Sequence, residues 1–269
     1  MARGVLLGRR LQQLYAPNLR GYSFINSEAD DYYGEWATDV SNERKAWLDE
    51  LFTDWKNDGV LEEFDRAFLI GPTTEATLTD LAHPSGTKAA IVNAVVFTAD
   101  RHVQGDGVSA RIRTNYTPST DAVNLTLNAG SIGVWTVNVN TAVTVNDIGN
   151  AVAPRCSLSS RLVGDQAQCR VNGSDPLSLN SHTDSRHMYQ AQRRTAADVR
   201  MFIDGAAATN SSWASTSLPT QEQWWLGANS TLFSIRYSVF AFWGGPMIGK
   251  EAALYTPLHT YLQRIGAVA

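Results

Sequence analysis

The spacing of hydrophobic residues predicts one long amphipathic helix near the start of the chain. Between residues 42 and 59 the large apolar side chains recur every three or four positions, at Trp47, Leu48, Leu51, Phe52 and Trp55. This spacing places them on one face of a helix. Ser41 or Asn42 would cap the first turn and Gly59 would end the helix. Such a helix must bury two tryptophans against the rest of the molecule.

After Gly86 the pattern changes to short segments typical of strands. They are rich in β-branched and aromatic residues and are separated by Gly, Asn, Asp, Ser and Pro at intervals of about ten residues. The predicted strands cover residues 91–98, 110–114, 123–127, 133–139, 155–162, 168–171, 188–192, 199–203, 224–227 and 233–243. A strand is also predicted at 67–70, followed by a small helix that Thr73 or Thr74 caps and that ends at Leu81. This rhythm is typical of an antiparallel sandwich or barrel, and no fixed period indicates a solenoid or propeller.

The two ends of the chain differ from this body. Residues 1–40 show no sustained period, so we expect an irregular arm that becomes ordered against another surface. A final helix is predicted over residues 251–265, closing on Gly266. Pro257 lies inside it, so we expect the helix either to restart there or to kink. The expected organisation is an arm over residues 1–40 and one sandwich domain with its N-terminal helix over residues 41–269.

The composition is that of a globular protein. The chain has 269 residues, of which 43% are hydrophobic and 18% charged, which supports an ordinary core and argues against disorder. The formal net charge of -4 gives no reason to expect nucleic acid or an anionic membrane as a partner. The first ten residues hold an apolar run too short for a secretion signal, and no window of about 18 residues is apolar enough to span a bilayer. We therefore expect a soluble protein made in the cytoplasm.

Two cysteines, Cys156 and Cys169, flank a predicted hairpin with its turn at Gly164 and Asp165. Their near-symmetric placement could set the two sulfurs opposite each other on paired strands. Two reduced thiols fit synthesis in the cytoplasm, and a disulfide is the alternative. Two cysteines without a second local pair do not indicate a metal site.

Several short segments, taken in their order along the chain, resemble those of a known family. They are residues 45–48, 61–69, 93–101, 104–107 and 199–205, and the pairs Leu254-Tyr255 and Tyr261-Leu262 before Gly266. Over roughly residues 43–269 this order is similar to that of the concanavalin A-like (laminin G-like) jelly-roll domains of tailed-bacteriophage and prophage virion proteins. The resemblance implies a mainly β fold of two curved antiparallel sheets packed face to face, with a helix beside them. It also implies a place in a virion, as a tail fibre, a tail-tip component, or a fibre or decoration of the capsid.

Enzyme chemistry is not indicated. Glucanases on this fold place three acidic residues on alternating positions of one strand, two of them acting as nucleophile and general acid. The nearest matches here are Glu28 with Asp30 and Glu63 with Asp65, and neither pair has the third acid in place. No Gly-x-Ser-x-Gly motif is present. We expect no catalytic residue.

No cofactor or metal site is predicted either. The five histidines are scattered, and only His182 and His187, in a predicted loop, could form a metal corner. The glycine-rich segment 105–107 lacks the further ligands of a calcium loop and is explained by a tight turn. Calcium is plausible in laminin G-like domains, and three aspartates are then possible ligands: Asp100, Asp106 and Asp204.

Tryptophans carry the remaining signal. Trp213 lies in the polar segment 210–217, where an indole has no obvious buried partner. Trp224 and Trp225 are neighbours in a predicted strand, so one of them should face outward. Flat aromatic rings are the surfaces on which sugar rings stack. We predict a glycan platform formed by Trp213, Trp224, Trp225, Asn210, Asn229 and Arg236, and the alternative is that these rings seal a contact between subunits.

The sequence thus favours a non-enzymatic virion protein, assembled as a homo-oligomer, with a trimer preferred, and displayed for contact with host-surface glycans or for structure alone. Its arm would dock on other virion proteins through aromatic residues: Tyr15, Tyr22, Phe24, Tyr32, Tyr33 and Trp36. Two functions of other classes are the alternatives. One is a polysaccharide-degrading tail spike, and the other is a cellular carbohydrate-binding module.

Overall fold

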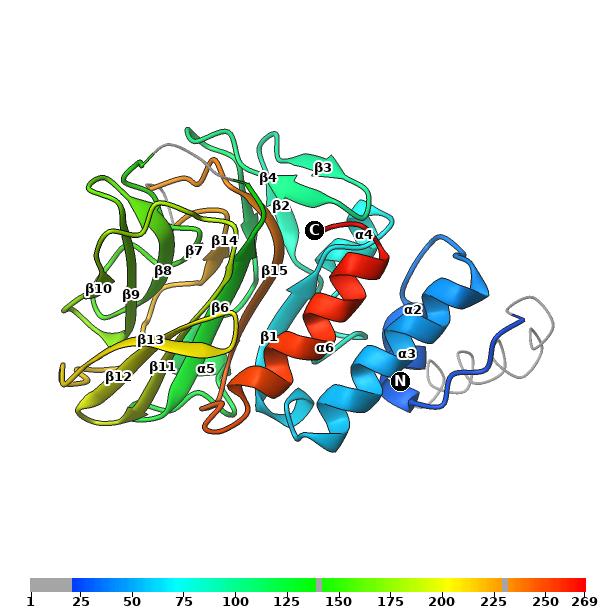
Figure 1. Ribbon diagram of the computed structural model, residues 1–269, viewed down its shortest axis with the longest axis horizontal. Coiled ribbons are helices and arrows are strands. Elements are labelled where there is room, and N and C mark those ends of the chain that lie inside the picture. The colour runs from blue at the N-terminus through cyan, green and yellow to red at the C-terminus, as the bar shows by residue number, and fades with distance from the viewer. Residues whose placement is uncertain (1–20, 139–141, 229–231) are drawn as a thin grey trace.

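The computed structural model describes residues 21–138, 142–228 and 232–269, and these form a β-sandwich with helices packed along one side (Figure 1). The helices are α2 (Ser27–Gly34), α3 (Asn42–Asn57), α4 (Thr74–Leu78), α5 (Pro118–Asp121) and α6 (Glu251–Arg264), with a short 3-10 helix at Leu61–Glu63. Within the described ranges, none of them has the length and hydropathy that crossing a bilayer requires.

The strands form two antiparallel sheets, which confirms the predicted two-sheet sandwich. The first sheet holds β1 (Phe64–Leu69), β3 (Val96–Thr98), β4 (His102–Gln104), β6 (Gly130–Thr136), β11 (Met188–Thr195), β12 (Asp198–Ile203), β13 (Ala206–Ser211) and β15 (Tyr237–Gly244). The second holds β2 (Ala90–Val92), β5 (Arg111–Arg113), β7 (Ile148–Gly149), β8 (Arg155–Leu162), β9 (Gln166–Gly173), β10 (Leu177–Leu179) and β14 (Trp224–Trp225). Their orders are β13-β12-β11-β6-β15-β4-β3, with β1 also paired to β15, and β10-β9-β8-β7-β14-β5-β2. The architecture is that of a jelly-roll sandwich with few helices.

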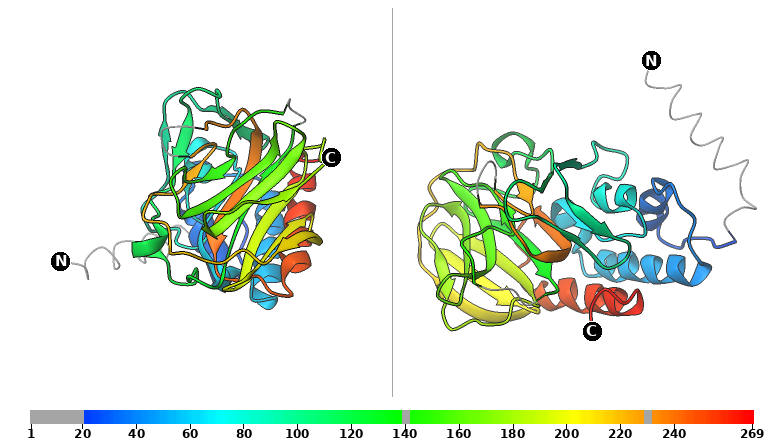
Figure 2. Two further views of the ribbon diagram at one scale, coloured as in Figure 1. Left: turned by 90° about the vertical axis from the view of Figure 1, so that its left-hand side faces the viewer. Right: turned by 90° about the horizontal axis from the view of Figure 1, so that it is seen from above.

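Helices α3 and α6 lie side by side against the outer face of the eight-stranded sheet (Figures 1 and 2). Trp55 of α3 packs on Phe64 and Phe240 of that sheet, and its Nε1 donates to the carbonyl of Leu254 in α6 at 3.1 Å. The predicted start of α3 is confirmed, because Ser41 Oγ accepts a hydrogen bond from the Arg44 amide. An apolar sheet face therefore continues into a helical layer, which extends the core beyond the two sheets.

The described end of the predicted arm, residues 21–40, is not irregular. Asn26 caps α2, because its side-chain oxygen accepts hydrogen bonds from the backbone amides of Glu28 and Ala29. Tyr32 is fully buried, its ring lies 5.6 Å from that of Phe52 on α3, and its hydroxyl donates to the carbonyl of Ala76. The prediction failed because α2 has few apolar residues, Ala29, Tyr32 and Tyr33, within a polar run, and its order comes from packing on α3.

Two predicted strands need correction. The segment 91–98 is split at Asn93, whose φ of 63° bends the chain so that β2 and β3 fall in different sheets. The segment 123–127 is not a strand, because the backbone amides of Val123, Asn124 and Leu125 donate hydrogen bonds to the Asp65 carboxylate and are not available to a neighbouring strand. The short strands β4, β7 and β10 and the six-residue edge strand β13 were not predicted. By contrast, α6 runs through Pro257 without restarting.

Candidate functional site

Trp213, the centre of the predicted glycan platform, lies on the surface and is held in one orientation. It follows β13, and 44% of its surface is exposed. Its Nε1 donates to the carbonyl of Pro176 at 3.1 Å, and its own carbonyl accepts a hydrogen bond from the buried Arg193 guanidinium at 3.0 Å. Asn210 is exposed on the same edge strand, paired with Arg200. The ring and this amide are therefore both available to a ligand.

The adjacent tryptophans do not belong to this surface. Trp225 is fully buried between the sheets, where its Nε1 donates to Ser238 Oγ at 2.8 Å. Trp224 is only 8% exposed, because the Arg111 guanidinium covers its ring at 4.4 Å from the ring centre. The expectation that one of the pair faces solvent is wrong. Alternation along a strand does put the two rings on opposite faces, but a cation covers the outer one.

Arg236 was predicted as a hydrogen-bonding rim and is instead a core residue with no exposed surface. Its Nε donates to Ser160 Oγ at 3.2 Å and lies 4.0 Å from the Asp147 carboxylate, and its Nη2 donates to the carbonyl of Arg161. A charge can lie between the sheets because these partners replace water. Asn229 lies outside the described residues. Of the predicted platform, the surface therefore retains Trp213 and Asn210.

The aromatic residues predicted to dock on another protein are used within the chain. Tyr32, Tyr33 and Trp36 are at most 9% exposed. Tyr22 donates its hydroxyl hydrogen to Asp49 on α3 at 3.0 Å, and the Phe24 ring packs on Tyr33. The predicted docking role is thus wrong for Tyr32, Tyr33 and Trp36, because these three rings pack within the chain and cover α3. Tyr15 lies outside the described residues.

The acidic residues that the sequence offered for catalysis or calcium have protein partners. Glu63 pairs with Lys250 at 2.8 Å and Glu28 pairs with Lys56 at 2.7 Å. Asp65 is buried and accepts four hydrogen bonds, three from backbone amides and one from the Tyr116 hydroxyl. These contacts give the three carboxylates structural roles.

The aspartates considered for calcium lie in separate places. Asp100 pairs with Arg44 at 2.7 Å, and Asp204 pairs with His187. Burial would raise the pKa of Asp106, but hydrogen bonds from the amides of residues 108–110 outweigh it and hold that pKa far below its usual range. Among the described residues, no three His, Cys, Asp or Glu side chains are grouped so as to hold a metal ion.

His182 and His187 do come together, with ring centres 5.7 Å apart at the ends of β11 and β12. Nδ1 of His187 lies 2.6 Å from the Asp204 carboxylate, and this hydrogen bond raises the His187 pKa. Nε2 of His182 lies 2.5 Å from the hydroxyl of Tyr189, and burial lowers the pKa of that imidazole. The two histidines fasten the loop before β11 to the sandwich.

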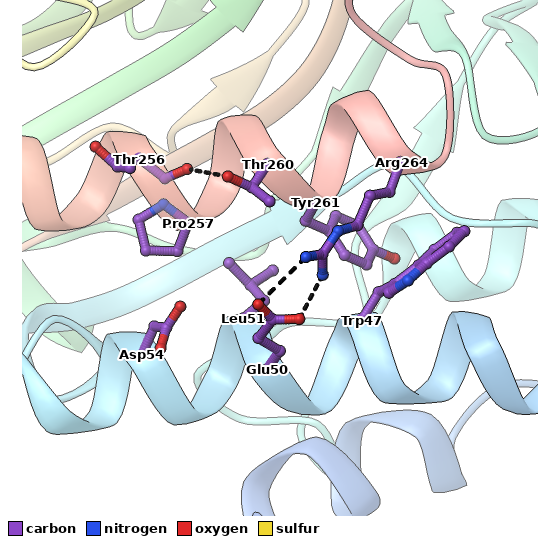
Figure 3. Close-up of a pocket in the computed structure, with 9 residues that line it drawn as sticks. All are labelled: Trp47, Glu50, Leu51, Asp54, Thr256, Pro257, Thr260, Tyr261 and Arg264. Carbon is purple, nitrogen blue, oxygen red and sulfur yellow. Dashed lines mark hydrogen bonds and ion pairs between the residues drawn. The ribbon is translucent and has the colours of Figure 1, made fainter.

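A groove between α3 and α6 was not predicted. It is a hollow of about 90 Å³ that Figure 3 shows with its lining side chains: Trp47, Glu50, Leu51, Asp54, Thr256, Pro257, Thr260, Tyr261 and Arg264. The i, i+3, i+7 spacing of Trp47, Glu50 and Asp54 was a visible signal that one helical stripe mixes an indole with two acids. The groove itself depends on packing between helices that are about 200 residues apart in the sequence.

No protein-family model and no curated protein matches the chain. Several solved structures do match it. A Trypanosoma rangeli sialidase in complex with 2,3-difluorosialic acid is 10% identical, with a TM-score of 0.51, covering 80% of this chain and 39% of the sialidase. A point variant of the protein HCR/D is 10% identical, with a TM-score of 0.50, covering 76% of this chain and 53% of that one. Domain 4 of a GH43 extracellular arabinanase from Geobacillus stearothermophilus, in complex with arabinotriose, is 11% identical, with a TM-score of 0.49, covering 71% of this chain and 100% of that domain.

At these identities the likeness concerns the fold alone, and it agrees with the jelly-roll sandwich described above. The chain spans about half of the HCR/D chain and less than half of the sialidase. One of these neighbours is a sialidase, which is an enzyme, so the expected lack of enzymatic activity stays a prediction. A phage origin also stays a prediction.

Proposed function

We propose that the chain is a structural domain of a tailed-bacteriophage virion that contacts host-surface glycans without cleaving them. The observation that carries the glycan part is Trp213, a large exposed ring whose orientation is fixed by hydrogen bonds at both its indole nitrogen and its carbonyl. A ring that is already ordered loses little conformational entropy when a ligand stacks on it. Trp213 is the only tryptophan among the large exposed hydrophobic residues of the described chain.

Polar groups near this ring in the sequence and the fold can complete the contact. Asn210 is exposed on β13, and Ser215 donates its hydroxyl hydrogen to Asn128 at 2.6 Å on a neighbouring loop. Hydroxyl and amide groups can donate to and accept from sugar hydroxyls. A ring face bordered by such groups is a common form of saccharide site, with weak affinity that several copies in an oligomer would multiply.

The absence of cleavage is supported by how the acidic residues are used. Retaining and inverting glycosidases need two carboxyl groups about 5–9 Å apart on either side of the bond that breaks. Glu63 and Asp65, one of the two pairs that most nearly match the glucanase pattern, are held by a lysine and by backbone amides, and Asp65 is only 3% exposed. Neither is placed to protonate or attack a bound glycan.

The virion part of the proposal rests on the order of several short sequence segments along the chain, which resembles that of phage jelly-roll domains. The fold is compatible with this resemblance. This part of the proposal includes attachment to other virion proteins and self-assembly into a homo-oligomer, a trimer by preference. Light scattering on the purified protein measures the oligomer. Mass spectrometry of purified phage particles tests the location, and finding the protein only in uninfected cells would favour a cellular carbohydrate-binding module instead.

Binding to arrays of bacterial surface polysaccharides tests the glycan contact. We expect Trp213→Ala to weaken binding about fivefold, since an aromatic stacking contact is worth about 1 kcal/mol. Val163→Ala, which trims another exposed apolar side chain at the tip of the β8–β9 hairpin, is the matched control and should bind as the unmodified protein does. Equal binding by Trp213→Ala would reject the platform, and shortened polysaccharide chains after incubation would favour a depolymerase.

A further inference from the structure

The groove between α3 and α6 is lined by three charged side chains, two carboxylates on α3 and one guanidinium on α6. Glu50 lies near its middle and forms an ion pair with Arg264, whose two terminal nitrogens both face the carboxylate, Nη2 at 3.3 Å from Oε1 (Figure 3). One turn farther along α3, Asp54 has no hydrogen-bond or ion-pair partner among the described residues. Glu50 and Asp54 therefore line the α3 side of the groove, and the Arg264 guanidinium reaches Glu50 from α6.

Asp54 is a half-buried carboxylate without a partner. Burial, together with the negative charges of Glu50 and Asp58, raises its pKa above the usual value, while Arg264 acts in the opposite direction. An acceptor held in this way gains from any neutral donor that enters the groove. Pro257 of α6 lies across from it, and farther along α6 the hydroxyl of Thr260 donates to the Thr256 carbonyl, which leaves its oxygen able to accept.

At the other end of the groove Trp47 supplies an apolar ring. Its side chain is partly buried against the core and lines the hollow beside the Glu50–Arg264 pair (Figure 3). Trp47 and Asp54 are seven residues apart on one helix, which corresponds to about 10 Å along the axis. One sugar ring stacked on Trp47 does not reach Asp54, whereas two linked rings span the distance.

We propose that this groove is a second saccharide site, which binds a neutral chain of at least two sugar rings, with one ring on Trp47 and the hydroxyls of the next between Arg264 and Asp54. Arg264 neutralises Glu50 and so weakens the attraction of the groove for a cation, and an anion is repelled by Asp54. A sugar diol suits these groups because each hydroxyl donates to a carboxylate and accepts from a guanidinium at the same time. The site is separate from Trp213 and does not depend on the glycan contact proposed there.

The indole N–H signals of the full-length protein, labelled with nitrogen-15 tryptophan, report on both sites at once. The chain has eight tryptophans, so each signal can be assigned by the one that disappears in a Trp→Phe variant. Cellobiose, maltose, lactose and diacetylchitobiose are titrated to about 20 mM, the range for weak millimolar binding, with glucose as the single-ring control. We expect at least one disaccharide to shift the Trp47 signal saturably and to bind about tenfold more tightly than glucose.

The variant Asp54→Asn, which keeps the size of the side chain, tests the polar end. We expect it to weaken the disaccharide about tenfold, because a hydrogen bond to a charged acceptor is lost, and to leave the other indole signals in place as proof of folding. Trp213→Ala should leave the Trp47 response unchanged. The proposal is overturned if no disaccharide shifts Trp47, if glucose binds equally well, or if a lysine-rich peptide shifts it and no sugar does. A shift confined to Trp213 would reject this site and leave the proposed function standing.

Discussion

Nδ1 of His187 lies 2.6 Å from Oδ2 of Asp204, while the other oxygen of that carboxylate accepts the Met188 amide at 2.9 Å. Asp204 belongs to the tight turn between β12 and β13, and its φ of 51° is the positive value that such turns require. One aspartate thus closes a hairpin and anchors the loop before β11. The hydrogen bond from the imidazole to Asp204 raises the His187 pKa.

The stability that His187 contributes should therefore depend on pH. Because the folded pKa lies above the unfolded value of about 6.5, the contribution is complete below that value and is lost as the pH rises through the folded pKa. We expect about 0.5–1 kcal/mol for this partly exposed pair. His187→Asn keeps a neutral donor near the position of Nδ1, so the difference in unfolding free energy between the two proteins isolates the imidazole charge.

Urea unfolding of both proteins from about pH 6 to pH 9 checks this expectation. The charged neighbours His182, Asp184 and Arg186 are present in both and largely cancel in the difference. Burial lowers the pKa of His182, so that residue titrates in the opposite sense and makes a single-protein profile hard to interpret. A difference that stays flat, or that grows toward high pH, would contradict the assignment.

Cys156 and Cys169 should be unreactive until the protein unfolds. Both are fully buried free thiols, and burial raises the pKa of each to about 12. The strand register places Cys156 opposite Val171 and Cys169 opposite Leu158, so the sulfurs are diagonal and not paired. We expect iodoacetamide at pH 8 to add no label to the native protein and two labels in urea. An intact mass lower by two hydrogens, with no label in urea, would show a disulfide instead.

The sheet could be predicted from sequence where a strand is long and bordered by a recognisable turn. The segment 155–162 is β8 residue for residue, because Gly164 and Asp165 supply the two positive φ values of a hairpin turn. Strands of two or three residues, such as β7 and β10, carry too few positions for a period to be detected. The helix α2 was missed for a related reason, since its order depends on the distant ring of Phe52.

The candidate site could be predicted only in part. Trp213 was identified because a lone indole in a polar segment has no local partner, and that reasoning needs no tertiary structure. The burial of Trp224 could not be anticipated, because it depends on Arg111, which is over a hundred residues away in sequence and adjacent through β5. The α3–α6 groove likewise requires two helices from opposite ends of the chain.

Asp65 should be among the most sensitive polar positions in the molecule. It is 3% exposed and accepts hydrogen bonds from Val123, Asn124 and Leu125 amides and from the Tyr116 hydroxyl. In Asp65→Asn an NH2 group replaces one carboxylate oxygen and faces backbone and hydroxyl donors that it cannot accept from. We therefore expect a loss of about 3 kcal/mol in the free energy of unfolding. Tyr116→Phe removes only one of the four bonds and should cost about 1 kcal/mol. Urea unfolding measures both, and a smaller loss for Asp65→Asn than for Tyr116→Phe would show that the carboxylate is not the anchor of this loop.

Gly133 of β6 should tolerate no side chain. A Cβ atom at this position would lie 2.1 Å from Cε1 of Phe242, which is itself packed against Phe64 and Phe240. The ring has little room to move, so Gly133→Ala should cost about 2–3 kcal/mol in unfolding free energy. Gly34→Ala, at the end of α2, meets nothing within 4 Å and should leave stability unchanged or raise it by up to about 1 kcal/mol.

A double variant separates crowding from a backbone effect at Gly133. Replacing Phe242 by leucine removes the ring atoms that the new methyl group would meet, so Gly133→Ala should cost less in that background than in the unmodified protein. We expect a coupling of about 1 kcal/mol or more between the two substitutions, measured from four thermal or urea unfolding curves. If the two costs simply add, the intolerance at Gly133 comes from the backbone of β6, and the close packing of Phe242 over the sheet is not its cause.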